Sequence, residues 1–139
     1  MNLLICETKR GIGEMKYEIC NESPLLSFAI ATYNKADVVW ELVNLLLSIN
    51  CEDIEVVVTD DASTDNTYTK LALVNDTRFK IFKNETNLGA INNMVKAVFN
   101  ASGKYVFYIN DRDSINIKHV SHIMECIKEQ DYSYVMVKN

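Results

Sequence analysis

The sequence predicts an α/β fold, in which a Rossmann-like, mostly parallel sheet is flanked by helices. Short apolar runs alternate with longer segments whose apolar residues recur at helical spacing, which is typical of a parallel sheet covered on both faces. Two of the apolar runs stop abruptly at carboxylates, as strands do at the ligand-binding edge of such a sheet. Gly and Pro are scarce, with 4 and 1 among 139 residues, so no linker is evident and one domain is expected.

The regular pattern begins at Pro24. Residues 1–23 have mixed polarity and no clear period, so we treat them as an N-terminal extension that precedes a domain at 24–139. The last residues of the chain are apolar and carry no stop signal, and we therefore expect the domain to be truncated at its C-terminus.

The first half of the domain is predicted to contain two strand–helix units. Residues 25–31 and 54–59 are short apolar runs, and each predicts a strand buried in the sheet. After the first strand, Asn34 can cap a helix that runs to about residue 50 with its apolar residues on one face. After the second strand, Ser63 or Thr64 can cap a helix that ends near residue 74.

The second half repeats this alternation. Residues 79–82, 105–109 and 132–137 predict three further strands. A helix opens at residues 87–89 and ends at 102–103, where a glycine follows it. Its apolar residues share one helical face, namely Ile91, Met94, Val95 and Val98. The same spacing predicts a last helix with Val120, Ile123, Met124 and Ile127 on one face.

Composition and charge exclude several classes of protein. The net charge of −5 argues against a nucleic-acid backbone as the main partner. No apolar run approaches the roughly 20 residues of a membrane span, and the apolar block at the N-terminus is too short for a signal peptide. The 4 cysteines are widely spaced without a C-x-x-C pair, and we interpret them as buried free thiols in a reducing cytosol.

Thr32, Tyr33 and Asn34 follow the first predicted strand, at the edge where open α/β sheets bind ligands. A tyrosine at this edge can stack on a planar base, while Asn34 caps the helix. A plain strand-to-helix turn is the alternative interpretation of the same three residues.

Asp60 and Asp61 follow the second predicted strand. Two adjacent carboxylates repel each other, so both ionise readily only where water, hydrogen-bond donors or a cation are close. One of such a pair commonly points into the fold and the other toward the ligand, where it can accept a hydrogen bond from an imide N–H such as that of uracil. The alternative is a solvated turn with a helix-capping aspartate.

Three residues of the third helical segment are further candidates. Asn87 and Gly89 flank a position where the backbone needs a small residue, and glycine lets another group approach closely. Asn93, inside the helix, could face the cleft, although a surface asparagine would have the same spacing.

The segment Asp111-Arg112-Asp113 follows the fourth predicted strand. Carboxylates in this pattern suit Mg²⁺ or Mn²⁺, which proteins bind through one or two carboxylates together with substrate phosphates. Arg112 could instead contact a phosphate or neutralise a neighbouring aspartate, in which case a metal would be weak or absent. A solvated acidic turn is the third interpretation.

Four motifs in this order resemble family 2 glycosyltransferases of GT-A fold. They are SFAIATYN at 27–34, EVVVTDDASTDNT at 55–67, NLG at 87–89, and GKY leading into DRD at 103–113. The resemblance covers Pro24 to Val137. Arg112 departs from the family, which commonly has a carboxylate at its position.

The resemblance implies a site for a nucleotide sugar. Tyr33 would flank the uracil and Asp61 would hydrogen-bond it, and Asp111 and Asp113 fall in the acidic motif that holds Mn²⁺ or Mg²⁺ on the diphosphate. The nucleotide-binding residues expected together are Thr32, Tyr33, Asn34, Asp61, Asn87, Gly89, Asn93 and Asp111. The acceptor-binding half and the catalytic base of the family are expected beyond residue 139.

The predicted function is donor binding in an inverting glycosyltransferase, with a nucleotide-sugar donor that is UDP-linked and a carbohydrate or lipid-linked acceptor. We expect a cytoplasmic protein, peripheral at the inner face of the membrane, that acts in surface polysaccharide synthesis. The isolated chain is expected to be inactive and to self-associate. Two alternatives remain: a catalytically inactive nucleotide-binding or scaffolding domain of the same fold, and a receiver-type signalling domain.

Overall fold

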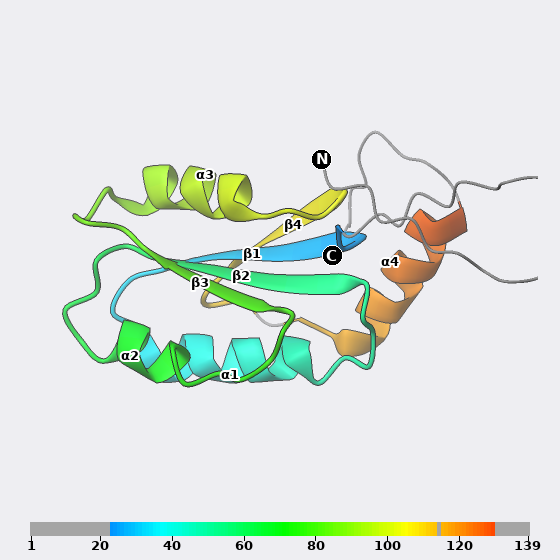
Figure 1. Cartoon of the computed structure of the whole chain (residues 1–139), viewed down its shortest axis with the longest axis horizontal. Coiled ribbons are helices and arrows are strands. Elements are labelled where there is room, and N and C mark those ends of the chain that lie inside the picture. Colours follow the sequence, from blue (N-terminus) through cyan, green and yellow to red (C-terminus); the bar gives the residue numbers. More distant parts are fainter. Residues whose placement is uncertain (1–22, 114, 130–139) are drawn as a thin grey trace, which may run out of the picture.

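A parallel sheet of four strands lies at the centre of the structure, a computed structural model that describes residues 23–113 and 115–129 (Figure 1). The strand order is β3-β2-β1-β4, and each neighbouring pair runs parallel. The strands are β1 (Leu26–Thr32), β2 (Ile54–Asp60), β3 (Phe79–Lys83) and β4 (Tyr105–Asn110). The predicted α/β fold is confirmed. Residues 1–22 of the N-terminal extension predicted at 1–23, and the fifth strand predicted at 132–137, lie outside the described residues.

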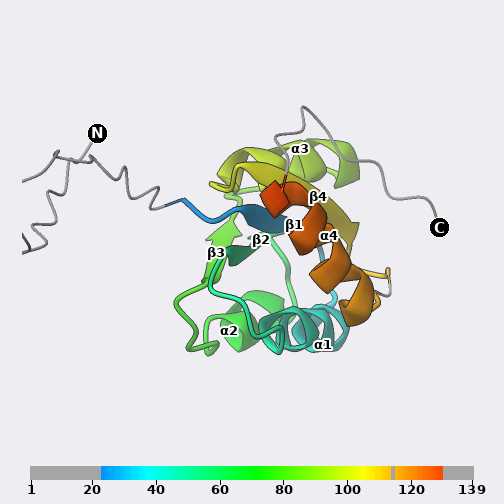
Figure 2. The same cartoon turned by 90° about the vertical axis from the view of Figure 1, so that its right-hand side faces the viewer.

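Helices cover both faces of the sheet. One face is covered by α3, and α1 and α2 lie on the opposite face (Figures 1 and 2). The helices are α1 (Ala36–Leu47), α2 (Thr67–Leu71), α3 (Ala90–Asn100) and α4 (Ile117–Glu129). In the described part of the chain, no helix is at once long enough and apolar enough to cross a lipid bilayer.

The core lies on the face of the sheet that α1 covers. The two central strands β1 and β2 are buried along almost their whole length, which explains why they read as continuous apolar runs rather than as alternating patterns. The last helix α4 contributes Val120, Met124 and Ile127 to the same core, as the helical spacing predicts. Removing side chains of this size from water stabilises the fold by about 1.5–3 kcal/mol each.

The predicted helix caps are wrong. The helix α1 begins at Ala36 without a side-chain cap, and Asn34 has a left-handed backbone with φ of 52°. Instead of capping its own helix, the Asn34 side chain reaches across to the next loop, where its Oδ1 accepts hydrogen bonds from the backbone N–H of Thr64 at 2.8 Å and Asp65 at 3.3 Å. The asparagine thus joins the loops that follow β1 and β2.

The second helix is also shorter than predicted. It begins at Thr67, not after Ser63 or Thr64, and it ends at Leu71. Ser63 does not cap it, because its hydroxyl and its backbone N–H donate to the carboxylate of Asp60. The serine therefore serves the buried acidic pair.

The helix α3 forms as predicted, but its apolar residues do not face the sheet. The sheet side of α3 consists of Asn93 and Ala97, which are buried. Ile91 and Phe99 are 76% and 82% exposed. The periodicity therefore identified the helix correctly while its apolar face points away from the sheet.

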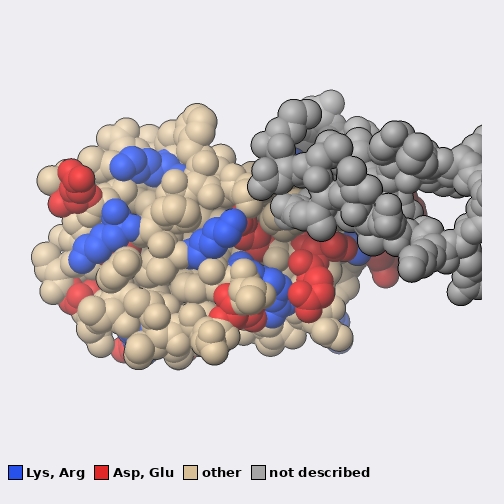
Figure 3. Space-filling model, viewed as in Figure 1, with Lys and Arg blue, Asp and Glu red and all other residues tan. Residues whose placement is uncertain are grey.

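The surface charge is mixed. On the face shown in Figure 3, basic and acidic side chains are interspersed among neutral ones. Cys51 and Cys126 are free thiols, as predicted, but both are only partly buried. Cys6 and Cys20 lie outside the described residues.

Candidate functional site

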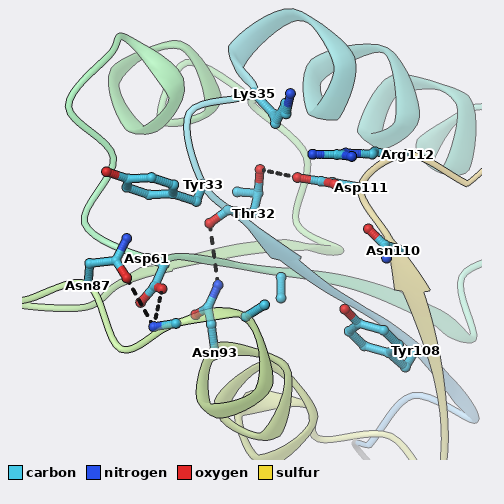
Figure 4. Close-up of a pocket in the computed structure, with 13 residues that line it drawn as sticks. Thr32, Tyr33, Lys35, Asp61, Asn87, Asn93, Tyr108, Asn110, Asp111 and Arg112 are labelled. Atoms are coloured by element: carbon cyan, nitrogen blue, oxygen red, sulfur yellow. Dashed lines mark hydrogen bonds between the residues drawn. The ribbon is translucent and has the colours of Figure 1, made fainter.

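A cavity of about 380 Å³ opens at the carboxyl ends of β1, β2 and β4 (Figure 4). This is the edge of the sheet at which the sequence placed its candidate residues. The cavity is lined by Ala31, Thr32, Tyr33, Lys35, Asp61, Asn87, Gly89, Ala90, Asn93, Tyr108, Asn110, Asp111 and Arg112. Seven of the nine candidates therefore line one cavity; Asn34 and Asp113 do not.

The two adjacent aspartates divide their tasks. Asp60 is fully buried and accepts hydrogen bonds from Ser63, whereas Asp61, also buried, lines the cavity. Neither carboxylate is solvated, so the alternative of a solvated turn is wrong. Ala62, directly after the pair, has a left-handed φ of 57°, which costs a residue with a Cβ about 1–2 kcal/mol.

Asp61 is held by three N–H groups, two of which lie just before α3 and one directly after β3. Its Oδ1 accepts from the side-chain amide of Asn84 and the backbone N–H of Leu88, both at 2.8 Å. Its Oδ2 accepts from the backbone N–H of Gly89 at 2.9 Å. The positive end of the helix dipole favours a carboxylate at this place. Since a carboxylate oxygen can accept two hydrogen bonds, Oδ2 retains one acceptor position for a ligand.

Asn93 ties the strands to the helix. Its amide donates to the backbone carbonyls of Thr32 at 3.3 Å and Thr59 at 3.0 Å, and its Oδ1 accepts from Asn84 at 2.9 Å. It is buried, so the alternative of a surface asparagine is wrong. Most of its hydrogen-bonding capacity is used inside the protein, and its main effect is to shape the cavity wall.

The sequence analysis missed Asn84, which donates to both Asp61 and Asn93. The available signal was its position two residues after the third predicted strand, at 79–82. Asn87 is exposed, and its Oδ1 accepts from the backbone N–H of Gly89 at 3.0 Å. Gly89 itself has φ of 83°, a conformation that favours glycine, which explains the small residue in this motif.

The acidic segment after β4 forms a tight turn. The backbone N–H of Asp113 donates to the carbonyl of Asn110 at 2.9 Å, which places Asp111 and Arg112 at the centre of the turn. Asp111 is nearly buried and accepts from the hydroxyl of Thr32 at 3.1 Å. Asp113 is exposed, and its Oδ2 accepts from the backbone N–H of Asn110 at 3.2 Å.

The charge of this turn affects Tyr108, whose ring lines the cavity. Burial raises the pKa of the Tyr108 phenol, and the nearby carboxylates of Asp111 and Asp113 raise it further. The phenol therefore stays protonated and can act as a hydrogen-bond donor at neutral pH.

The donor set of the turn was tested for a divalent cation. Among the described residues, no group of three or more His, Cys, Asp or Glu side chains could enclose a metal ion. Asp111 and Asp113 provide two carboxylates on one turn, which matches a hard cation that takes its remaining ligands from phosphate and water. The residues fit a cation shared with a ligand, not a closed protein cage.

Lys35 is a second residue that the sequence analysis missed. Its side chain lies in the cavity beside Arg112 (Figure 4). Its backbone N–H donates to the Thr67 hydroxyl at 3.1 Å, which fixes its main chain at the start of α1. The signal was weak, because a lysine after a strand is most often a solvated side chain.

Several curated proteins resemble this chain. It is 32% identical over 107 residues to the UDP-Glc:alpha-D-GlcNAc-diphosphoundecaprenol beta-1,3-glucosyltransferase WfaP of Escherichia coli, a match that covers 75% of this chain and 43% of the relative. It is 35% identical over 99 residues to the abequosyltransferase RfbV of Salmonella typhimurium, covering 66% of this chain and 29% of the relative. This chain thus spans less than half the length of these relatives.

A solved structure agrees with the fold. The crystal structure of S. aureus TarS 1-349 in complex with UDP superimposes with a TM-score of 0.68 at 30% identity, covering 75% of this chain and 32% of the TarS 1-349 chain. The profile of the family described as glycosyl transferase family 2 matches residues 27–139. This membership excludes the receiver-type alternative, and the motif order, the sheet and the matched relatives agree: the chain belongs to glycosyl transferase family 2.

Proposed function

We propose that this chain binds the donor in an inverting glycosyltransferase that transfers a sugar from a UDP-linked donor to an acceptor hydroxyl. The observation that carries the proposal is that the two ends of the cavity differ in chemistry. Tyr33, Asp61 and Asn87 lie together at one end, and Asp111 and two cationic side chains lie at the other (Figure 4). A nucleoside diphosphate has the same two ends: a planar base with one imide N–H at one end, and a negatively charged diphosphate at the other.

The uracil base would bind at the end of the cavity that contains Tyr33 and Asp61. The Tyr33 side chain is 41% exposed, which leaves a ring face free for stacking. The free acceptor position on Asp61 Oδ2 suits the imide N–H of uracil, whereas adenine offers no such group. The printed name of WfaP includes UDP-Glc, and TarS was solved with UDP, which supports uracil as the base.

The diphosphate would bind at the second end. Asp111 and Asp113 would hold Mn²⁺ or Mg²⁺ there, together with the diphosphate oxygens. When bound, such a cation supplies Lewis acidity to the departing diphosphate. The turn positions these two carboxylates, and the Thr32 hydroxyl orients the Asp111 carboxylate.

The proposal also covers the acceptor and the catalytic base. WfaP is named for a lipid-linked acceptor, so we propose a lipid-linked or carbohydrate acceptor and a cytoplasmic enzyme that works at the inner face of the membrane. This chain spans 43% of WfaP. We therefore also propose that it binds donor but transfers little sugar without the remainder of such an enzyme, including the catalytic base.

Calorimetric titration with UDP, GDP and ADP in the presence of Mn²⁺ tests the proposal. UDP should bind most tightly, because uracil offers a single imide N–H to the one free acceptor position of Asp61 next to a stacking ring, whereas adenine lacks such a group and guanine carries an additional N–H donor beside its ring N–H. Equal affinity for the three diphosphates would reject the uracil assignment.

Arg112 supports a second candidate, a catalytically inactive nucleotide-binding domain of the same fold. An arginine in the acidic turn places a positive charge where the family commonly has a carboxylate. Metal-dependent hydrolysis of a nucleotide sugar, measured with this chain joined to the remainder of the enzyme proposed above, separates the two, since slow release of the sugar to water requires a complete, working site. An inactive binding domain would bind the nucleotide sugar without releasing its sugar.

A further inference from the structure

Two cations that line the cavity have no side-chain partner among the described residues. In the described part of the chain, the ammonium of Lys35 and the guanidinium of Arg112 form no hydrogen bond or ion pair with another side chain. They come from different elements, the start of α1 and the turn after β4, yet they lie on the same side of the cavity as Asp111 (Figure 4). Unpaired cations that meet in a cavity indicate an anionic ligand.

Carboxylates of the protein already accept hydrogen bonds at two helix starts on this edge. Helix N-termini commonly bind phosphate through their free N–H groups. Here, the start of α3 is occupied by Asp61, which accepts from Leu88 and Gly89. The start of α1 is occupied by Asp65, which accepts from the backbone of Ala36. Because these starts already hold negative charge, we expect the charge that balances a diphosphate to come from side chains or from a metal.

The charges of the cavity lead to the same conclusion. Its carboxylates are Asp61 and Asp111, and its cations are Lys35 and Arg112. The negative charge of Asp61 is stabilised by three N–H donors, whereas Asp111 accepts only the Thr32 hydroxyl among the described residues. A diphosphate beside Asp111 would be repelled unless positive charge lay between them, and Arg112 is adjacent to that aspartate in the turn.

We propose that Lys35 and Arg112 bind the diphosphate of the donor directly and sustain donor binding in the absence of a divalent cation. The proposal rests on the proposed function and adds two diphosphate-binding residues to it. A metal at Asp111 and Asp113 adds affinity to this site but is not required for it. Lys35 offers a compact ammonium, and Arg112 offers a fork that can contact two phosphate oxygens.

The test compares the affinities of two ligands that share one base but differ in the diphosphate. Uridine and UDP are titrated into the full chain in excess EDTA, for wild type, Lys35→Ala, Arg112→Ala and the double variant. Wild type should bind UDP at least about tenfold more tightly than uridine, which is the effect of one charge-assisted contact. Each single variant should reduce this preference and the double variant should remove it, with uridine affinity unchanged.

The controls separate charge from folding. Lys118→Ala removes an exposed lysine outside the cavity and should leave the preference intact. Arg112→Lys should keep part of it. Truncating the side chain of Lys35 or Arg112 leaves in place the backbone hydrogen bonds of the start of α1 and of the turn after β4. A thermal melt of each variant verifies the fold.

The outcomes are distinguishable from those of the proposed function. If the double variant keeps the wild-type preference, or if wild type prefers UDP only when Mn²⁺ is added, Lys35 and Arg112 do not bind the diphosphate. If UDP binds no better than GDP, the uracil assignment fails, but the comparison of guanosine with GDP still scores the two cations. Absence of any nucleotide binding overturns both proposals.

Discussion

Asp61 shows how one side chain combines a structural and a functional task. Its two oxygens accept hydrogen bonds from two backbone N–H groups just before α3 and from the side-chain amide of Asn84 after β3, and the same carboxylate lines the cavity. A residue used in this way is expected to affect folding and binding together. Variants at this position must therefore be read with both measurements.

We predict that Asp61→Ala lowers UDP affinity by about 1–3 kcal/mol, because a hydrogen bond to a charged group is lost. The same change should lower the melting temperature, since three donors lose their acceptor. Asp37→Ala is the matched control, because Asp37 is exposed and forms only a surface ion pair with Lys70. Calorimetry and thermal denaturation check the two effects. Unchanged UDP affinity in a folded Asp61→Ala protein would contradict the role in base recognition.

Asp113 carries the prediction for the metal. Adding Mn²⁺ should raise UDP affinity, and Asp113→Ala should abolish that rise while leaving binding in EDTA intact. The reason is that Asp113 does not line the cavity and reaches a ligand only through a shared cation. Titration of UDP with and without Mn²⁺ measures it. A variant that still responds to Mn²⁺ like wild type would rule out Asp113 as a ligand.

At the scale of elements, the end of α1 is set by a residue far along the chain. The guanidinium of Arg78 donates to the carbonyls of Leu47 and Ile49, both at 2.7 Å, and Cys51 at 3.0 Å. Asp76 holds the arginine in turn, and the hydrogen bond between the two lowers the pKa of Asp76. The helix therefore ends at Leu47, three residues before the predicted end.

Arg78→Ala should destabilise the fold by about 2 kcal/mol, because several partly buried carbonyls lose a charged donor. Arg78→Lys should recover only part of the loss, since an ammonium cannot reproduce the fork. Chemical denaturation measures the free energies of unfolding. Equal stability of the arginine, lysine and alanine forms would show that water replaces the guanidinium at no cost.

The opposite end of the sheet contains a buried charge. Glu55 on β2 accepts from Ser27 at 2.5 Å and from the hydroxyl of Ser102 at 2.7 Å, and it pairs with Lys80 at 2.5 Å. Gly103 is required beside this cluster, because a Cβ would lie 2.6 Å from the Ser27 hydroxyl. Burial raises the pKa of Glu55, but the hydrogen bonds from Lys80, Ser102 and Ser27 outweigh it and lower the pKa from 4.5 to about 2.

This depressed pKa predicts an acid-dependent stability. The folded protein holds the proton of Glu55 less tightly than the unfolded chain, so the contribution is complete above pH 4.5 and is lost as the pH falls toward about 2. The shift corresponds to about 3 kcal/mol. Unfolding free energies of wild type and Glu55→Gln, measured across this range, should converge as the pH falls. A constant difference between the two proteins would contradict it.

For the whole molecule, the sequence predicted the order of strands and helices and the edge of the sheet that carries the site. The helical periodicity and the carboxylates that directly follow the apolar runs are enough for this prediction, because both are patterns within a few residues of sequence. The cap predicted at Asn34 was wrong because its partner Thr64 lies 30 residues away, in a contact that local spacing does not encode. The cap predicted at Ser63 was wrong because Asp60, three residues before it at the end of β2, accepts its hydrogen bonds. Lys35 was missed for the same reason, since only the fold brings it beside Arg112.

The orientation of α3 is a further case. Its polar residue Asn93 faces the sheet because the carbonyls at the ends of β1 and β2 need a donor there. The apolar residues Ile91, Val95 and Phe99 recur at i, i+4 and i+8 and form one outward stripe. Periodicity alone cannot tell which face of an amphipathic helix meets the sheet.

This stripe leads to the last prediction, self-association of the chain. The sequence analysis expected it, and the outward stripe of α3 places an exposed apolar surface on a described helix, where contact with a second copy removes it from water. The double variant Ile91→Gln and Phe99→Gln should lower the apparent mass at high protein concentration. Leu73→Gln is the matched control, because Leu73 is 76% exposed, as is Ile91, but lies outside the stripe. Sedimentation of the three proteins over a range of concentrations measures the effect. A wild-type chain that remains monomeric throughout, or a control that dissociates as readily as the double variant, would remove α3 as the contact surface.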